Sequence, residues 1–397
     1  MSKFHYTFNL AALFGIILSC ITHALSPSSA YTSAVLRVVY DGTLFHGWSD
    51  ANDGSIAILP NDGEARLNKR SRSRRNRLRP SVKMGEVRSV QGTLRFALSK
   101  LYGNVDVHNV IIEGCSRTDA GVSARHMIAL IYCLKEVDKE NKNVATLSIK
   151  GKRIPHPSSP RDDEFKPLPF DSDLQKMVYA LNKMLPPDVM IADASTMPTD
   201  SSDETHERPF HPSLDTISKT YSYTFSVGIA HDPLQCRNDW HIQSNNSFNM
   251  KRAQDCASRL CGTHDFINFR GAFRGSERGK IQDTTCTIHN ISICEEGIDT
   301  PIPSYSRYKI SVEGNRFLYK MVRFLVGIIV QYGTDEKKSW QDLSTALSSD
   351  TFEEYSKDTD ERNDQPKAKA RLCAPANGLI LDDVTFDNKW RFHWTFQ

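Results

Sequence analysis

The chain lacks the sequence features that define several protein classes. Its net charge is only +3, too small to indicate nucleic-acid binding by itself. Its nine cysteines are scattered, with no Cys-x-x-Cys pair and no Cys/His group at zinc-ligand spacing, which favours reduced thiols over disulfides or a zinc site. No apolar stretch is long enough for a comfortable membrane span, and no hydrolase triad or nucleotide-binding motif is present.

The composition is that of an ordinary globular protein. The 397 residues are 39% hydrophobic and 24% charged. This length accommodates two or three domains or one large bilobal unit.

The first 34 residues have the three-part form of a signal peptide. Lys3 precedes an apolar run from Leu10 to Ile21, and a stretch rich in serine and alanine follows. We interpret residues 1–34 as a targeting segment, and we expect no stable membrane association once it is removed.

Hydrophobic periodicity divides the remainder into an N-terminal half, residues 35–205, and a C-terminal half, residues 206–397. Both halves show the order strand, helix, strand, strand, helix, which is typical of a ferredoxin-like α+β fold. We therefore expect two such halves, each an antiparallel sheet with helices on one face, separated by an active-site cleft. The predicted strands are Val35–Tyr40, Val110–Ile112, Met127–Leu134, Val189–Ile191, Ile217–Val227, Thr285–Ile293 and Tyr305–Val312. Two predicted helices are capped by Ser89 and by Asp171 or Ser172. Two more run over Met250–Leu260, closed by Gly262, and over Phe317–Tyr332, closed by Gly333.

Three segments break this pattern, at residues 50–88, 136–170 and 349–371, and we interpret them as mobile loop insertions. The first is strongly basic, with no acid between Arg66 and Lys83. Its Arg72, Arg74 and Arg75 are candidates for contacts with an RNA backbone. A solvated disordered loop and a part of the sorting signal are the alternatives.

A glycine-flanked loop around Asp119 is the main candidate for chemistry. It follows the predicted strand Val110–Ile112 directly, so it can present a carboxylate to a cleft. On spacing alone, a surface turn capped by Asp119 is an equally good interpretation.

Eight blocks of sequence between residues 35 and 385 resemble, in order, the motifs of the TruA family of tRNA pseudouridine synthases. They are Tyr40-Asp41-Gly42-Thr43 with Phe45-His46-Gly47-Trp48; Ser89-Val90-Gln91-Gly92; Gly114-Cys115-Ser116-Arg117-Thr118-Asp119-Ala120-Gly121-Val122; Leu185-Pro186-Pro187-Asp188; Phe210-His211 with Ser218-Lys219-Thr220-Tyr221; Gly262-Thr263-His264-Asp265-Phe266; Gly314-Asn315-Arg316-Phe317 through Arg323; and Ala374-Pro375-Ala376 with Gly378. Ser49 and Ser123 depart from the family's usual residues.

The resemblance implies a role for each of four residues. Asp119 would be the nucleophile, attacking either the base or the sugar carbon of uridine. Arg323 would pair with Asp119, and Tyr221 would stack on the flipped base. Arg117 would help to extrude the nucleotide or hold its phosphate. Alternatively, Arg323 is a solvated helix residue and Tyr221 a core aromatic.

The resemblance also implies a reaction without a cofactor or metal, a tRNA partner, target uridines in the anticodon stem-loop, and a homodimer. We interpret the matched residues His211, His264 and Asp265 as structural. The alternative function is a non-catalytic tRNA-binding or chaperone protein of the same fold; a secreted hydrolase would need a triad or metal cluster. A tRNA substrate and a signal-like start are reconciled by bipartite delivery to a plastid, with a mitochondrial or cytosolic location as alternatives.

Overall fold

The computed structural model describes residues 30–49, 88–135, 146–149, 152–200, 208–244, 247–271, 283–297, 304–347 and 372–396, with residues 300 and 302. Most of the predicted targeting segment, the candidates Arg72, Arg74 and Arg75, and the insertion 349–371 lie outside the described residues. None of the helices in the described ranges has the length and apolar character that crossing a membrane requires.

The N-terminal half has the predicted ferredoxin-like order, with a fourth strand completing it. Its strands pair antiparallel in the order β2-β3-β1-β6. The elements are β1 Ser33–Tyr40, α2 Val90–Leu101, β2 Val110–Gly114, β3 Ser123–Cys133, α3 Leu174–Met184 and β6 Val189–Thr196. Because β1 begins at Ser33, the sheet includes the last two residues of the predicted targeting segment.

Helix starts in this half follow side-chain capping. Ser89 caps α2 as predicted, and its hydroxyl accepts a hydrogen bond from the backbone N–H of Gly92. The predicted start of α3 at Asp171 or Ser172 is wrong. Both residues have positive φ, and Asp173 is the residue that caps the helix through the N–H of Lys176.

The C-terminal half repeats the order, and its strands pair antiparallel as β11-β12-β8-β13. The elements are β8 Thr216–Gly228, α4 Met250–Leu260, β11 Thr285–Glu296, β12 Ser306–Gly314, α5 Met321–Thr334 and β13 Leu379–Phe386. Additional elements are β9 Trp240–Gln243 beside β8, β10 Gly262–Asp265 beside β11, and α6 Trp340–Leu347.

Two helix boundaries in this half illustrate different uses of glycine. Gly262, with φ of +105°, directly follows the C-cap of α4, as predicted. Gly333 does not end α5, which continues to Thr334. A Cβ on Gly333 would lie 2.0 Å from the ring of Phe248, so this glycine permits close packing. The start of α5 also differs from the prediction, because Lys320 is left-handed and the helix begins at Met321.

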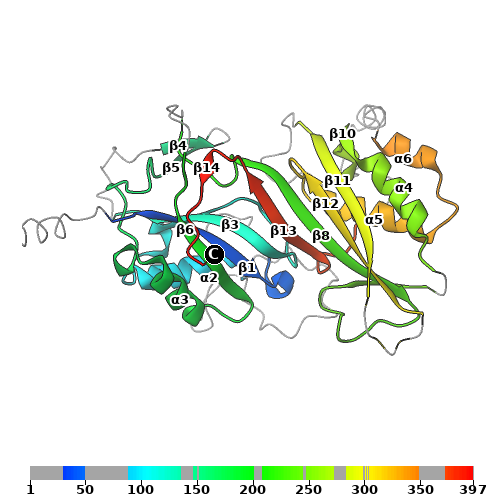
Figure 1. Cartoon of the computed structure of the whole chain (residues 1–397), viewed down its shortest axis with the longest axis horizontal. Coiled ribbons are helices and arrows are strands. Elements are labelled where there is room, and N and C mark those ends of the chain that lie inside the picture. Colours follow the sequence, from blue (N-terminus) through cyan, green and yellow to red (C-terminus); the bar gives the residue numbers. More distant parts are fainter. Residues whose placement is uncertain are drawn as a thin grey trace, which may run out of the picture.

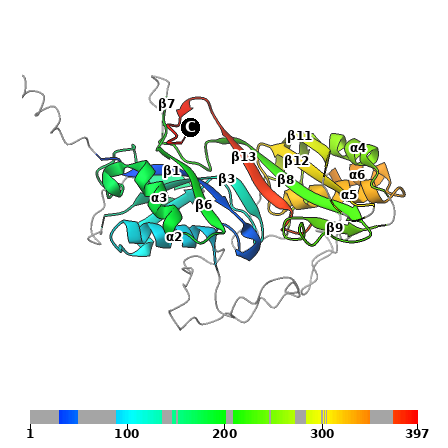
Figure 2. The same cartoon turned by 60° about the horizontal axis from the view of Figure 1, so that its bottom comes forward.

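The two halves form one continuous sheet, where we had expected two facing sheets. Strand β13 pairs antiparallel with β8 on one side and parallel with β3 on the other, at Ile380–Ser123 and Leu381–Ala124. Figure 1 shows β13 between the halves, with α2 and α3 at one end of the molecule and α4, α5 and α6 at the other. Figure 2 shows the same sheet running through both halves. The fold is α+β, as predicted.

The described part of the insertion 136–170 is structured, which corrects the expectation of a mobile loop. It contains a hairpin of β4 Thr146–Ile149 and β5 Lys152–Pro155. His156 and Phe165 each expose only 1% of their surface, so the segment is packed against the sheet. The C-terminal tail also returns to the N-terminal half, where β14 Trp390–Arg391 pairs with β7 Thr199–Asp200. Short 3₁₀ helices lie at Gly42–Leu44, Val107–Asn109, Phe170–Ser172 and Ile267–Phe269.

Candidate active site

The loop that carries Asp119 joins β2 to β3 and is held by the segment that follows β1. The N–H of Trp48 donates to the carbonyl of Thr118 at 3.1 Å, and the N–H of Gly121 donates to the carbonyl of Phe45 at 3.1 Å. The buried hydroxyls of Tyr40 and Thr118 are 2.7 Å apart. Backbone and side-chain contacts together therefore fix the loop before any substrate binds.

Gly47 allows this close approach. Its φ is +111°, a conformation that disfavours other residues. A Cβ at this position would lie 2.6 Å from the carbonyl oxygen of Thr118. Gly47 also forms an isolated β-bridge with Asp119, so the catalytic candidate and the glycine are direct backbone partners.

Asp119 faces the C-terminal half rather than capping a surface turn. Its side chain is 23% exposed, and Oδ2 lies 3.6 Å from Nη1 of Arg323. The turn interpretation is correct only for the backbone, where the N–H of Val122 donates to the carbonyl of Asp119. A partly exposed carboxylate beside a guanidinium is ionised, oriented and accessible to a ligand.

Arg323 lies in the first turn of α5, and its side chain is 7% exposed. Its Nε donates to the carbonyl of Ala374 at 2.7 Å, while the N–H of Ala374 donates to the carbonyl of Arg323 at 3.0 Å. This reciprocal pair fixes the guanidinium so that Nη1 points to Asp119. Arg323 is therefore not the solvated helix residue of the alternative interpretation.

Tyr221 lies on β8 at 7% exposure, and its hydroxyl is 2.9 Å from Oγ of Ser116 in the Asp119 loop. Its ring packs edge-on against Phe317 at a centroid distance of 5.2 Å. Burial raises the pKa of Tyr221, and the nearby Cys115 and Asp119 add to this, although the bond to Ser116 opposes it. The phenol is therefore neutral and able to donate a hydrogen bond at physiological pH.

The remaining sequence candidates are placed differently. Arg117 is exposed at the rim of the loop. His264 contacts the carbonyl of Cys261 at 2.9 Å, and Asp265 accepts hydrogen bonds from Ile267 and Thr284, so both stabilise the local turn. Within the described part of the chain, no three His, Cys, Asp or Glu side chains are arranged as metal ligands.

Sequence reasoning gave no role to the Ala374-Pro375-Ala376 block, although the block was among the matched motifs. In the structure it connects the two halves of the site. Ala374 holds Arg323, and the hydroxyl of Tyr223 donates to the carbonyl of Pro375 at 2.8 Å. A Cβ on Gly121 would lie 3.3 Å from the methyl group of Ala376, so this segment also packs against the Asp119 loop.

Comparison with known proteins gives consistent matches. Residues 256–387 match a family model described as tRNA pseudouridine synthase. The chain is 26% identical to tRNA pseudouridine synthase A 2 of Clostridium tetani over 353 residues, which cover 89% of this chain and 98% of the relative. It is 29% identical to tRNA pseudouridine synthase A of Chlamydia trachomatis over 304 residues, covering 75% and 77%. A third relative, tRNA pseudouridine synthase A of Geotalea daltonii, is 29% identical over 245 residues, covering 62% and 75%.

Proposed function

We propose that this chain, which is similar to tRNA pseudouridine synthases of the TruA family, isomerises uridine to pseudouridine in tRNA, with Asp119 as the nucleophile. The reaction breaks the bond between N1 and C1′, turns the base, and joins C5 to C1′. N1 gains a proton and C5 loses one, so no oxidant, reductant or phosphoryl donor is needed. The observation that carries the proposal is the Asp119 carboxylate, partly exposed and 3.6 Å from a buried guanidinium.

Each neighbouring residue has a role that follows from its position. Arg323 keeps Asp119 ionised and oriented, because Ala374 fixes its guanidinium. Tyr221 offers an aromatic edge and a neutral hydroxyl at the same loop, which suits a flipped base. Arg117 is exposed beside this site, where it can contact a phosphate of the extruded nucleotide. The carboxylate attacks either the sugar carbon or the base, and both routes give the same product.

The finer parts of the proposal concern the substrate and the assembly. The family resemblance favours uridines of the anticodon stem-loop and a homodimer that shares one tRNA. Mapping of pseudouridines in tRNA from cells without the protein tests the first point. Light scattering of the purified chain, alone and with tRNA, tests the second.

Delivery to a plastid is a separate proposal, supported by the signal-like pattern of the N-terminus. A fluorescent fusion of residues 1–60 tests it. A plastid signal supports the proposal, and a diffuse cytosolic or a mitochondrial signal rejects it.

The central experiment compares Asp119→Asn with wild type for release of tritium from C5-labelled uridine in tRNA. We expect the variant to bind tRNA with unchanged affinity and to release no tritium above background. Asp188→Asn is the matched control, because Asp188 also pairs with an arginine, Arg88, but outside the site. Tritium release by Asp119→Asn would reject the mechanism. A wild-type protein that binds tRNA without releasing tritium would instead indicate the non-catalytic binding protein.

A further inference from the structure

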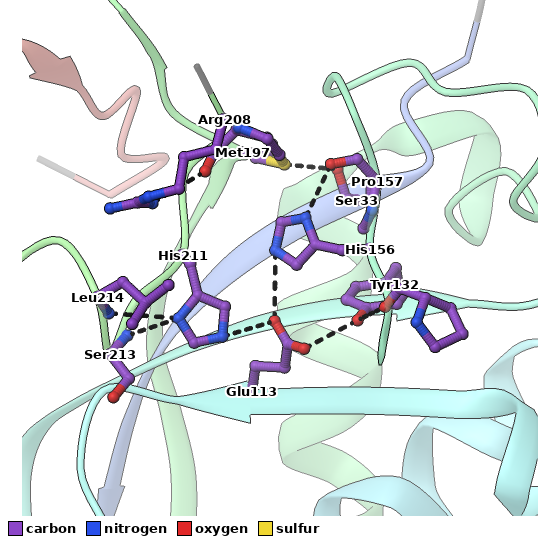
Figure 3. Close-up of polar contacts among 12 residues, drawn as sticks. Ser33, Glu113, Tyr132, His156, Pro157, Met197, Arg208, His211, Ser213 and Leu214 are labelled. Atoms are coloured by element: carbon purple, nitrogen blue, oxygen red, sulfur yellow. Dashed lines mark hydrogen bonds and ion pairs between the residues drawn. The ribbon is translucent and has the colours of Figure 1, made fainter. Parts of the chain in front are cut away.

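A buried cluster of titratable side chains lies behind the strand that leads to Asp119 (Figure 3). Its centre is Glu113 of β2, the residue before Gly114. Oε2 of Glu113 lies 3.2 Å from Nε2 of His211 and 3.4 Å from Nε2 of His156. The hydroxyl of Tyr132 lies 3.0 Å from Oε1 of Glu113 and 2.6 Å from the carbonyl oxygen of Pro155, so the two acceptors share one donor. None of these side chains takes part in the chemistry proposed above.

The last two residues of β2, Glu113 and Gly114, contact different parts of the chain on the two faces of the strand. Successive residues of a strand point to opposite sides of the sheet, so Glu113 and Gly114 face opposite ways. On the side of Gly114, the Trp48 ring packs so closely that a Cβ would lie 2.7 Å from it. The end of β2 is therefore held by Trp48 on one face and by the Glu113 cluster on the other.

The geometry determines the charges in the cluster. The N–H groups of Ser213 and Leu214 donate to Nδ1 of His211, so the ring proton is on Nε2, 3.2 Å from Oε2 of Glu113. Burial alone would raise the pKa of the Glu113 carboxyl, but His156 and His211 lower it to about 2. Glu113 is therefore an anion in a nearly water-free site, which makes its contacts both strong and costly to lose.

Three separate parts of the chain meet at this carboxylate. His156 comes from the insertion that begins at residue 136, and His211 comes from the segment that connects the two halves. Tyr132 lies on β3, the strand that β2 pairs with. Among the described strands, β2 has no other partner, so it is an edge strand of only five residues. A short edge strand frays easily unless side chains fix its end.

We propose that Glu113 is a positioning residue: with His156 and His211 it fixes the end of β2 and so holds the Asp119 loop in its active geometry. The proposal deepens the proposed function and rests on it for its catalytic consequence. It also assigns a structural role to the insertion that begins at residue 136, because His156 connects that segment to β2, the strand before the Asp119 loop.

The test uses Glu113→Gln, which keeps the side-chain size and removes the charge. Amide hydrogen exchange of a peptide covering residues 114–122 should become at least about tenfold faster in the variant, because local opening of β2 becomes easier. The single-turnover rate with saturating tRNA, per folded molecule, should fall about tenfold while the tRNA dissociation constant stays within twofold, because misplacement slows the chemical step and not binding.

Asp193→Asn is the matched control. Asp193 is a buried carboxylate on β6, the other edge strand of the same half, and it accepts backbone hydrogen bonds from Thr395 and Phe396. It should leave the exchange of residues 114–122 unchanged. If Glu113→Gln does not fold, Tyr132→Phe removes the hydroxyl that Glu113 shares with the carbonyl of Pro155, and it should show the same changes to a smaller extent.

Unchanged exchange of residues 114–122 in the folded variant would overturn the proposal. Equal slowing of turnover by Glu113→Gln and Asp193→Asn would also overturn it, because the effect would then be general destabilisation. If the wild-type protein makes no pseudouridine, the proposed function fails, and the exchange measurement still decides whether Glu113 holds the loop.

Discussion

Replacement of Arg323 by methionine separates two effects of one side chain. Methionine has a similar length but no charge and no donor. The carbonyl of Ala374 then loses the Nε donor at 2.7 Å, which costs about 1–3 kcal/mol of folding stability for a buried acceptor. Asp119 loses a guanidinium at 3.6 Å, where the attraction is at most about 4–5 kcal/mol at an effective dielectric constant near 20.

The loss of rate is smaller than this limit, because Asp119 is 23% exposed and water screens the pair. We expect turnover to fall by about tenfold to a thousandfold, which corresponds to about 1.4–4 kcal/mol. The assay is tritium release at saturating tRNA, corrected for the folded fraction at the assay temperature. Arg252→Met is the control, since Arg252 also donates from a helix to backbone carbonyls, at Tyr332 and Lys338. Turnover of Arg323→Met within twofold of wild type would refute the reasoning.

Three further predictions follow from local geometry. The free energy of unfolding of Gly47→Ala, measured by chemical denaturation, should be about 1–3 kcal/mol lower than that of wild type, and most of the turnover should be lost, because the new Cβ clashes with the carbonyl of Thr118. Gly103→Ala is the control, since Gly103 also has positive φ but a Cβ there would have nothing within 4 Å. This variant should lose less stability and keep its turnover. Tyr221→Phe should bind tRNA normally and turn over more slowly, and an unchanged rate would exclude a role for the hydroxyl. The stability that the Glu113 carboxylate contributes is fully present above pH 4.5, its ordinary pKa, and is lost as the pH falls towards its folded pKa of about 2. The denaturation midpoint of Glu113→Gln should therefore fall less over this pH range than the midpoint of wild type.

The fold was largely predictable because helices and strands have separate hydrophobic periods. The stripe of α2 and its Ser89 cap are local features, and the structure confirms both. The union of the two halves was not predictable, because it depends on β13. The pairing of Ile380 with Ser123 joins residues more than 250 positions apart, and no local pattern encodes such a contact.

The site was predictable to a different degree at each residue. The motif blocks predicted Asp119, Arg323 and Tyr221 as site residues, and the structure brings these three together. Spacing alone did not distinguish Asp119 from a turn residue, because a turn and a catalytic loop use the same small residues. The Glu113 cluster escaped notice because its members are far apart in the sequence, and a single buried histidine has no sequence pattern of its own.

The continuous sheet affects how a substrate reaches Asp119. The segment from Ala374 to Leu381 contacts Arg323 at its start and pairs with β3 at its end, so it connects α5 to the strand that follows the Asp119 loop. A hinge motion between the halves would break these pairings as well as the pairing of β13 with β8. The Asp119–Arg323 pair is therefore already assembled in the chain without RNA. With Asp119 as the proposed nucleophile, this arrangement predicts that the target uridine leaves the base stack to reach the carboxylate.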